Sequence, residues 1–257
     1  MIRKVLFIML TFIACAGTIA SPSSTWAEPL AQKTILANGL TLIVAERNQL
    51  PTIHLQVMIR AGSTQDPPHL LGLANVTAEL LTQGTPQRKA TQISREIESV
   101  GGSLSASCES DYAAVNLSIL KKDLPLGLSI LSDVLLNPLF AVEEIERKIS
   151  EMKARLKRMD EEPRQVAQLA FSKKLFGSHP YAHPTEGSSE TLSSISQKDL
   201  RDFYKTYYRP DNVIIVMVGQ ISLAEGKGLI EPLFKEWKPA PFIGPVAPQS
   251  PLLRCRS

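Results

Sequence analysis

The sequence has few cysteines, almost no net charge and no long apolar run, and each shortage excludes a class of protein. Lysine and arginine number 28 against 25 aspartate and glutamate residues, and the excess includes Arg3 and Lys4. Without those two the balance is 26 to 25, or +1, which is not the electrostatic footprint of a nucleic-acid-binding protein. The apolar run at residues 5–14 is shorter than the roughly 20 residues of a membrane span. The sequence also signals no Ser-His-Asp or Cys-His arrangement and no Gly-rich phosphate loop.

The cysteines are limited to Cys15, Cys108 and Cys255. Cys15 lies in a predicted leader, and the two cysteines that follow it are too few to fix a disulfide framework. We therefore predict that Cys108 is a packed thiol in a strand and that Cys255 is a thiol in a loose tail. A disulfide between them is the alternative.

Residues 1–27 are organised like a secretory signal, with Arg3 and Lys4 before the apolar run and small residues before Ala27. The pattern predicts cleavage after Ala27 and an exported protein, periplasmic or secreted, whose mature chain has no membrane span. A lipid anchor on Cys15 is one alternative, although Phe12 stands where a lipoprotein signal usually has leucine. A retained membrane anchor is the other, and the short apolar run disfavours it.

The remaining chain predicts an α+β fold. Its 44% hydrophobic content can bury a sizeable core, in one or two compact domains. Strands are predicted at residues 34–45, as a hairpin around Asn38-Gly39, and at 53–60, 103–108, 112–119 and 212–219. Helices are predicted at 68–85, 91–100, 124–135, 142–176 with a break near Pro163, 197–207 and 223–234. Because the strands alternate and form hairpins, we expect a mostly antiparallel sheet with helices packed on one face.

Residues 68–85 are the stretch that carries most information. Apolar residues recur there at three- and four-residue spacing, which predicts one helix, and Gly84 occupies the expected stop. The apolar stripe comprises Leu73, Val76, Leu80 and Leu81. The other face carries Asn75, Ala78 and Glu79, which we expect to line the concave wall of the domain.

The frame Gly-Leu-Ala-x-x-x-x-x-x-Leu-x-x-Gly-Thr at residues 72–85 resembles the helix on which insulinase/pitrilysin-type and mitochondrial-processing peptidases carry the inverted zinc motif H-x-x-E-H. Three further segments match the same family in its order. They are Leu-Ala-Asn-Gly-Leu at 36–40, Phe-Gly-x-His-Pro-Tyr-x-x-Pro-x-x-Gly at 176–187, and Tyr-Tyr-Arg-Pro-Asp-Asn at 207–212 before an apolar strand. The resemblance covers residues 34–233 and implies an amino-terminal domain of that family.

In active members two histidines four residues apart share one Zn²⁺ and the glutamate between them activates water. The resemblance places Asn75 and Glu79 at the histidine positions, Ala78 at the glutamate position and Arg155 at the third ligand position. Asn is a poor zinc ligand, Ala transfers no proton, and a cation repels zinc. We therefore expect no catalytic residue, no bound metal and no cofactor. Glu151, one turn from Arg155, is the alternative third position.

Other candidate residues have simpler interpretations. His179 and His183 have H-x-x-x-H spacing, but prolines surround them, so we expect a loop in place of a metal site. His69 lacks a partner at ligand spacing and is expected to cap the helix or face solvent. The charge runs at 143–148 and 153–158 predict a solvated helix face.

Three functions remain open. The resemblance implies first a non-catalytic subunit that pairs with a zinc-bearing homologue and helps enclose peptide substrates. The alternatives are an active zinc metalloendopeptidase with unrecognised ligands and a free-standing peptide-binding or scaffold module. We predict a leader at 1–27, a peptidase-type amino-terminal domain at 28–236 and a Pro-rich linker at 237–257. The family's second homologous domain is then absent, as in a truncated reading frame, a fragment or a half-size subunit.

Overall fold

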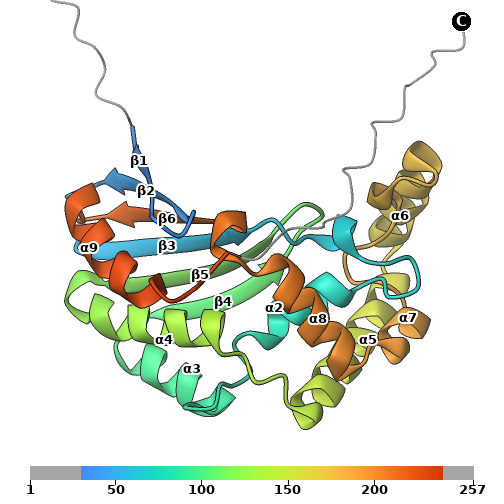
Figure 1. Ribbon diagram of the computed structural model, residues 1–257. Helices are drawn as coiled ribbons and strands as arrows, with labels where there is room; N and C mark the ends of the chain where they lie inside the picture. Colours follow the sequence, from blue (N-terminus) through green and yellow to red (C-terminus); the bar gives the residue numbers. More distant parts are fainter. Residues whose placement is uncertain (1–29, 240–257) are drawn as a thin grey trace, which may run out of the picture. The chain divides into compact units, whose positions relative to one another are not determined.

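The computed structural model describes residues 30–239, and its centre is a six-stranded sheet (Figure 1). The strands are β1 (Gln32–Ile35), β2 (Thr41–Glu46), β3 (Thr52–Ile59), β4 (Ser103–Cys108), β5 (Ala113–Leu120) and β6 (Val213–Gly219). They lie in the order β1-β2-β6-β3-β5-β4, and every neighbouring pair is antiparallel except β2 and β6. The predicted mostly antiparallel sheet, with the strand at 212–219 inside it, is confirmed.

One face of this sheet forms the core. Buried residues on that face alternate with half-buried or exposed ones along β2, β3 and β6, and along β5 from Val115 onward, as the two-residue period of a strand requires. Four helices cover this face: α2 (Leu73–Leu80), α3 (Ala90–Ser99), α4 (Leu124–Leu136) and α9 (Leu223–Phe234) (Figure 1). The buried side chains form one continuous cluster. Helices on one face were expected, and this arrangement confirms it.

The other helices lie toward one end of the molecule (Figure 1). They are α5 (Val142–Asp160), α6 (Pro163–Phe176), α7 (Ser189–Ser194) and α8 (Gln197–Tyr207). The short 3-10 helices are η1 (Ser63–Gln65), η2 (Lys121–Asp123), η3 (Pro180–Ala182) and η4 (Pro210–Asn212). Pro163 ends the long helical stretch where expected, because proline fits the first turn of a new helix and not the interior of an old one.

The predicted helix at 68–85 is wrong in its bounds, since α2 is shorter at both ends. Its start is set by Gly72, which has the left-handed φ of 95°, and by Asp66, whose carboxylate accepts the N–H groups of Gly72 and Ala74 at 2.7 and 2.8 Å. Gly84 does not cap the helix but pairs with Lys89 in an isolated β-bridge. The chain therefore turns before Gly84 is reached.

Within residues 30–239 no helix has the length and apolarity needed to cross a bilayer. The predicted leader with Cys15, the tail from residue 240 and Cys255 lie outside the described residues.

Candidate functional site

Helix α2 is enclosed on nearly every side. Its apolar stripe is buried as predicted, with Val76 at 0% and Leu80 at 1% exposure. The expectation that the opposite face lines a concave wall is wrong for Asn75 and Ala78, which are 5% and 0% exposed. Only Glu79 of that face keeps a partly exposed side chain, at 13%. A solvent-filled site on α2 is thus reduced to the surroundings of one carboxylate.

Two cations from α5 hold that carboxylate. The Arg155 guanidinium donates to Glu79 through Nη1 to Oε1 at 2.9 Å and through Nη2 to Oε2 at 3.3 Å. The Lys148 ammonium lies 3.2 Å from Glu79 Oε2 and 3.2 Å from Glu151 Oε2. Positions 148 and 155 are two helical turns apart, so both side chains leave α5 on the side that faces α2. The hydrogen bond with Glu79 raises the pKa of Arg155 above its ordinary value, so the guanidinium stays charged.

A third cation extends the cluster along α5. Arg147 donates to Glu144 and to the Gln83 side chain, both at 2.6 Å, and it also pairs with Glu151. Gln83 belongs to the turn that follows α2, so this contact ties the end of α2 to the start of α5. We call Glu79, Lys148, Glu151 and Arg155 the ion cluster. Its two carboxylates and two cations balance, and no member is left as an unpaired acid or base.

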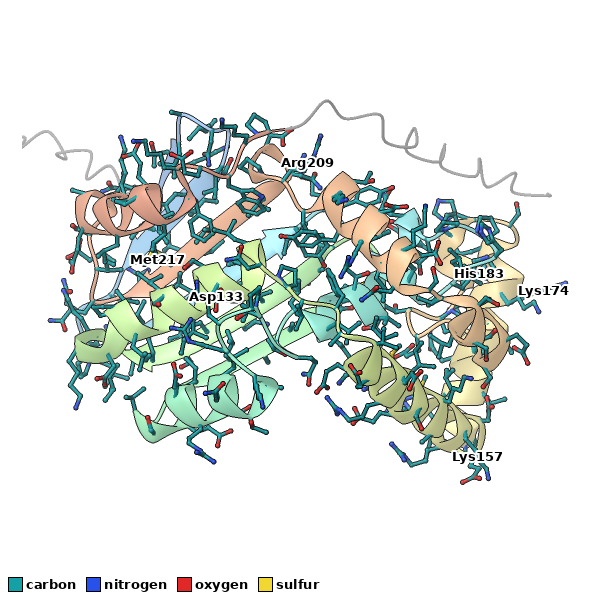
Figure 2. All side chains as sticks on the ribbon, turned by 60° about the horizontal axis from the view of Figure 1, so that its bottom comes forward. Asp133, Lys157, Lys174, His183, Arg209 and Met217 are labelled. Carbon is teal, nitrogen blue, oxygen red and sulfur yellow. The ribbon has the colours of Figure 1, made fainter. Side chains whose placement is uncertain are left out.

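The two histidines of the 176–187 loop do not converge on a metal. His179 Nδ1 accepts a hydrogen bond from the Tyr181 backbone N–H at 3.2 Å. The rings of the same two residues pack edge to face, with their centroids 4.7 Å apart. The Tyr181 hydroxyl in turn donates to the Asp111 carboxylate at 2.8 Å, which fastens the loop to the β4–β5 turn. His183 lies exposed beside α6 (Figure 2). Among residues 30–239 no group of three or more His, Cys, Asp or Glu side chains could hold a metal ion.

The remaining candidates lie apart from the ion cluster. His69 faces solvent before α2, as one of its two interpretations predicted. Cys108 is a free thiol at the end of β4, and it packs against the core as expected. Burial raises the pKa of this thiol above its ordinary value, which disfavours the reactive thiolate form.

Lys148 is the site residue that the sequence analysis missed. The charge runs of α5 were predicted to be solvated, and Lys157 does point into solvent (Figure 2). Lys148, in contrast, is only 9% exposed. The sequence did contain a signal for this burial. Lys148 lies three residues after Ile145 and four residues before Met152, both of which are buried, and it therefore lies on the apolar stripe of α5.

The six-stranded mixed sheet and the helices on one of its faces make an α+β domain (Figure 1). The chain belongs to the insulinase family, peptidase family M16: the family model matches residues 42–189, and the model of the peptidase M16 inactive domain matches residues 194–255. The predicted family is therefore confirmed.

Known relatives are longer than this chain. An uncharacterised zinc protease of Mycobacterium tuberculosis, Rv2782c, is 27% identical over 204 residues, which cover 78% of this chain and 46% of the relative. The mitochondrial-processing peptidase subunit beta of Blastocladiella emersonii is 28% identical over 216 residues, which cover 83% of this chain and 46% of that subunit. The peptidase M16 inactive domain from Pseudomonas fluorescens superposes with a TM-score of 0.78 at 25% sequence identity. The superposition covers 84% of this chain and 53% of that structure. The periplasmic protease PqqL from Escherichia coli superposes with a TM-score of 0.78 at 19% sequence identity, over 87% of this chain and 26% of that structure. At this identity the similarity shows that the fold is shared and nothing more. The chain thus spans about half the length of the curated relatives it matches.

Proposed function

We propose that this chain is a zinc-free, non-catalytic member of the insulinase family that pairs with a zinc-bearing homologue and helps enclose peptide substrates. The observation that carries the proposal is the ion cluster, in which Arg155 and Lys148 both bind the Glu79 carboxylate. In active relatives the second histidine and the third ligand face one metal. The contact between Glu79 and Arg155 supports the assignment of these two residues to those positions.

The chemistry of the cluster opposes zinc binding. Two unit charges of like sign at 4 Å repel by about 4 kcal/mol at an effective dielectric constant of 20, and the repulsion doubles for a divalent ion. Zinc beside Glu79 would meet two such cations and would have to displace both. Asn75 is buried and a poor ligand, and Ala78 offers no group that could activate water. Glu79 alone would be an incomplete site.

The pairing is proposed from the relatives. Two of them are named as subunits, the processing peptidase subunit beta and subunit 1 of the bovine cytochrome b-c1 complex. We also propose that residues 28–236 form the amino-terminal type of family domain and residues 237–257 a linker. The signal-like leader supports an exported chain.

Metal analysis and a peptidase assay of the purified chain test the first half of this proposal. We expect no stoichiometric zinc and no cleavage of a fluorogenic peptide library. The triple variant Asn75→His, Ala78→Glu, Glu79→His is expected to remain inactive while Arg155 is present. Adding Arg155→Glu should tighten zinc binding, whereas Arg158→Glu, the same charge change on an exposed residue of α5, should not. One zinc per wild-type chain with chelator-sensitive cleavage would make the chain an active metallopeptidase.

Co-purification tests the second half. A zinc-bearing homologue from the same organism, expressed together with this chain, is expected to form a complex that cleaves peptides faster than the homologue alone. A chain that stays monomeric beside every zinc-bearing homologue of that organism would be a free-standing module, and the pairing would be refuted.

A further inference from the structure

One loop ties α6 to the sheet, and a histidine holds that loop in shape. Residues 177–187 lead from α6 toward α7 and contain η3, whose first turn is capped by His179. The imidazole Nδ1 accepts the Tyr181 backbone N–H at 3.2 Å. The Tyr181 hydroxyl donates to Asp111, in the turn between β4 and β5, at 2.8 Å. We call residues 177–187 the strap, because they connect α6 to that turn.

Helix α6 depends on the strap for its position. None of its 14 residues is buried, and Val166, Leu169 and Phe171 are 47%, 40% and 60% exposed. A helix of this length is marginal on its own in water, so contacts with other elements must hold it. Its contacts with η3 are more extensive than its contacts with α5. Between α5, α6 and the strap lies a groove of about 710 Å³, whose walls include Leu156, Met159, Val166, Leu169, Tyr181 and His183.

The cap of η3 differs from the other helix caps because protonation can remove its acceptor. Three other helix starts are capped by the hydroxyl groups of Ser188, Ser196 and Ser222, which accept a hydrogen bond across the physiological pH range. An imidazole accepts only while one ring nitrogen is unprotonated, and a second proton turns Nδ1 into a donor. In the closed strap that donor would face the N–H of Tyr181. The closed form therefore binds fewer protons, and a fall in pH favours the open form.

We propose that the strap is a pH-sensitive closure of this groove, which opens when His179 takes up a second proton. A histidine ordinarily does so at about pH 6.5. Loss of the cap unwinds η3, which positions the Tyr181 side chain against Asp111. The hydrogen bond with Asp111 raises the pKa of Tyr181, so its hydroxyl keeps its proton in this range. Release of Tyr181 from Asp111 then frees α6 and uncovers the groove. The device needs no partner chain.

Other titratable groups lie on the elements packed against the strap and in the strap itself. They are Lys173 and Lys174 on α6, Asp66 after η1, Glu109 and Asp111 in the β4–β5 turn, and His183 and Glu186 in the strap. Carboxylates ordinarily titrate at about pH 4 and lysines at about pH 10, so most of these charges are constant between about pH 5.5 and 7.5. The exceptions are the second histidine, His183, and Asp66, because burial raises the pKa of Asp66 to about 7. Both need a control.

Hydrogen exchange of the purified chain, followed by mass spectrometry at about pH 7.5 and about pH 5.5, tests the proposal. After correction for the intrinsic exchange rate, we expect protection of the strap and α6 to fall about tenfold at the lower pH, the usual size of effect when an N-cap is lost. His179→Asn supplies a carbonyl oxygen that caps a helix and does not titrate, so it should keep wild-type protection at both pH values. The matched controls, His183→Asn and Asp66→Asn, should respond to pH as the wild type does.

Several outcomes would overturn the inference. One is equal protection of the wild-type strap at both pH values, and another is an equal loss of protection in β3, since the whole domain would then be unfolding. A pH response that survives in His179→Asn, or disappears in His183→Asn or Asp66→Asn, would make another group the sensor. If His179→Asn is unprotected throughout, His179→Asp decides. Protection at both pH values supports the cap, and its absence shows that the imidazole ring holds the strap by packing, which also overturns the inference.

Discussion

Removing the charge of Glu79 while keeping its shape tests the ion cluster directly. The side chains of Glu79 and Lys148 are 13% and 11% exposed, whereas Arg155 is 40% exposed. Loss of one partner from a buried ion pair costs about 3 to 5 kcal/mol, and loss from an exposed pair about 0.2 to 1. In Glu79→Gln, Arg155 can turn to solvent but Lys148 stays buried and keeps only Glu151. We therefore expect a destabilisation of about 2 to 3 kcal/mol.

The assay is urea unfolding followed by circular dichroism at pH 7, with chelator present. Glu151→Gln is the matched control, because Glu151 also binds Lys148 but is 45% exposed, and it should cost no more than about 1 kcal/mol. Lys148→Met combined with Glu79→Gln should recover part of the loss, with a coupling of about 0.5 to 3 kcal/mol. The reasoning fails if Glu79→Gln costs no more than Glu151→Gln. It also fails if, in a second series without chelator, added zinc raises the urea midpoint of the wild type but not of Glu79→Gln, since Glu79 would then be a ligand.

Three further predictions concern α2 and its surroundings. Leu80→Ala should cost about 2 to 5 kcal/mol in urea unfolding because it opens a cavity in the core, whereas Leu175→Ala, at a 47% exposed position of α6, should stay within about 0.5 kcal/mol. Burial raises the pKa of Asp66 from 3.8 to about 7, so the folded state binds this proton more tightly than the unfolded state does. The stability that the bound proton contributes is therefore lost as pH rises from 4 to 7. Asp66→Asn should flatten that part of a plot of unfolding free energy against pH. Gly187→Ala should cost at least about 1 kcal/mol more than Gly101→Ala. Both glycines have a left-handed φ, but of the two only Gly187 would place a Cβ 2.1 Å from a backbone carbonyl oxygen, that of Leu71. Equal Tm shifts for the two variants would contradict this steric argument.

Most of the fold could be predicted because its signals are local. The hairpin at residues 34–45 follows from the Asn38-Gly39 turn, and Gly39 does have a positive φ, of 90°. The bounds of α8 and α9 agree with the prediction, since Ser196 and Ser222 cap their first turns. Each of these signals lies within a few residues of the feature it sets.

The errors arose where distant side chains decide the structure. The start of α2 depends on Asp66, which lies six residues before Gly72 and reaches it only because residues 67–71 turn between them. Helix α7 was missed because its six residues show too little periodicity, although Ser188 forms a capping box with Thr191. The burial of Lys148 depends on which side of α5 packs against α2, and a run of charged residues does not predict which side that is.

The charge balance of the ion cluster explains why the proposed loss of zinc is hard to reverse one residue at a time. Glu79 and Glu151 are matched by Lys148 and Arg155, so the cluster is neutral and joins α2 to α5 by hydrogen bonds. Replacing Glu79 by histidine would leave two cations short of a carboxylate, and replacing Arg155 by glutamate would place three carboxylates around one lysine. Each single change therefore destabilises the domain before any metal can bind, because an uncompensated charge near the interior is costly. Only several simultaneous changes would exchange the ion-paired link for a metal-bound one.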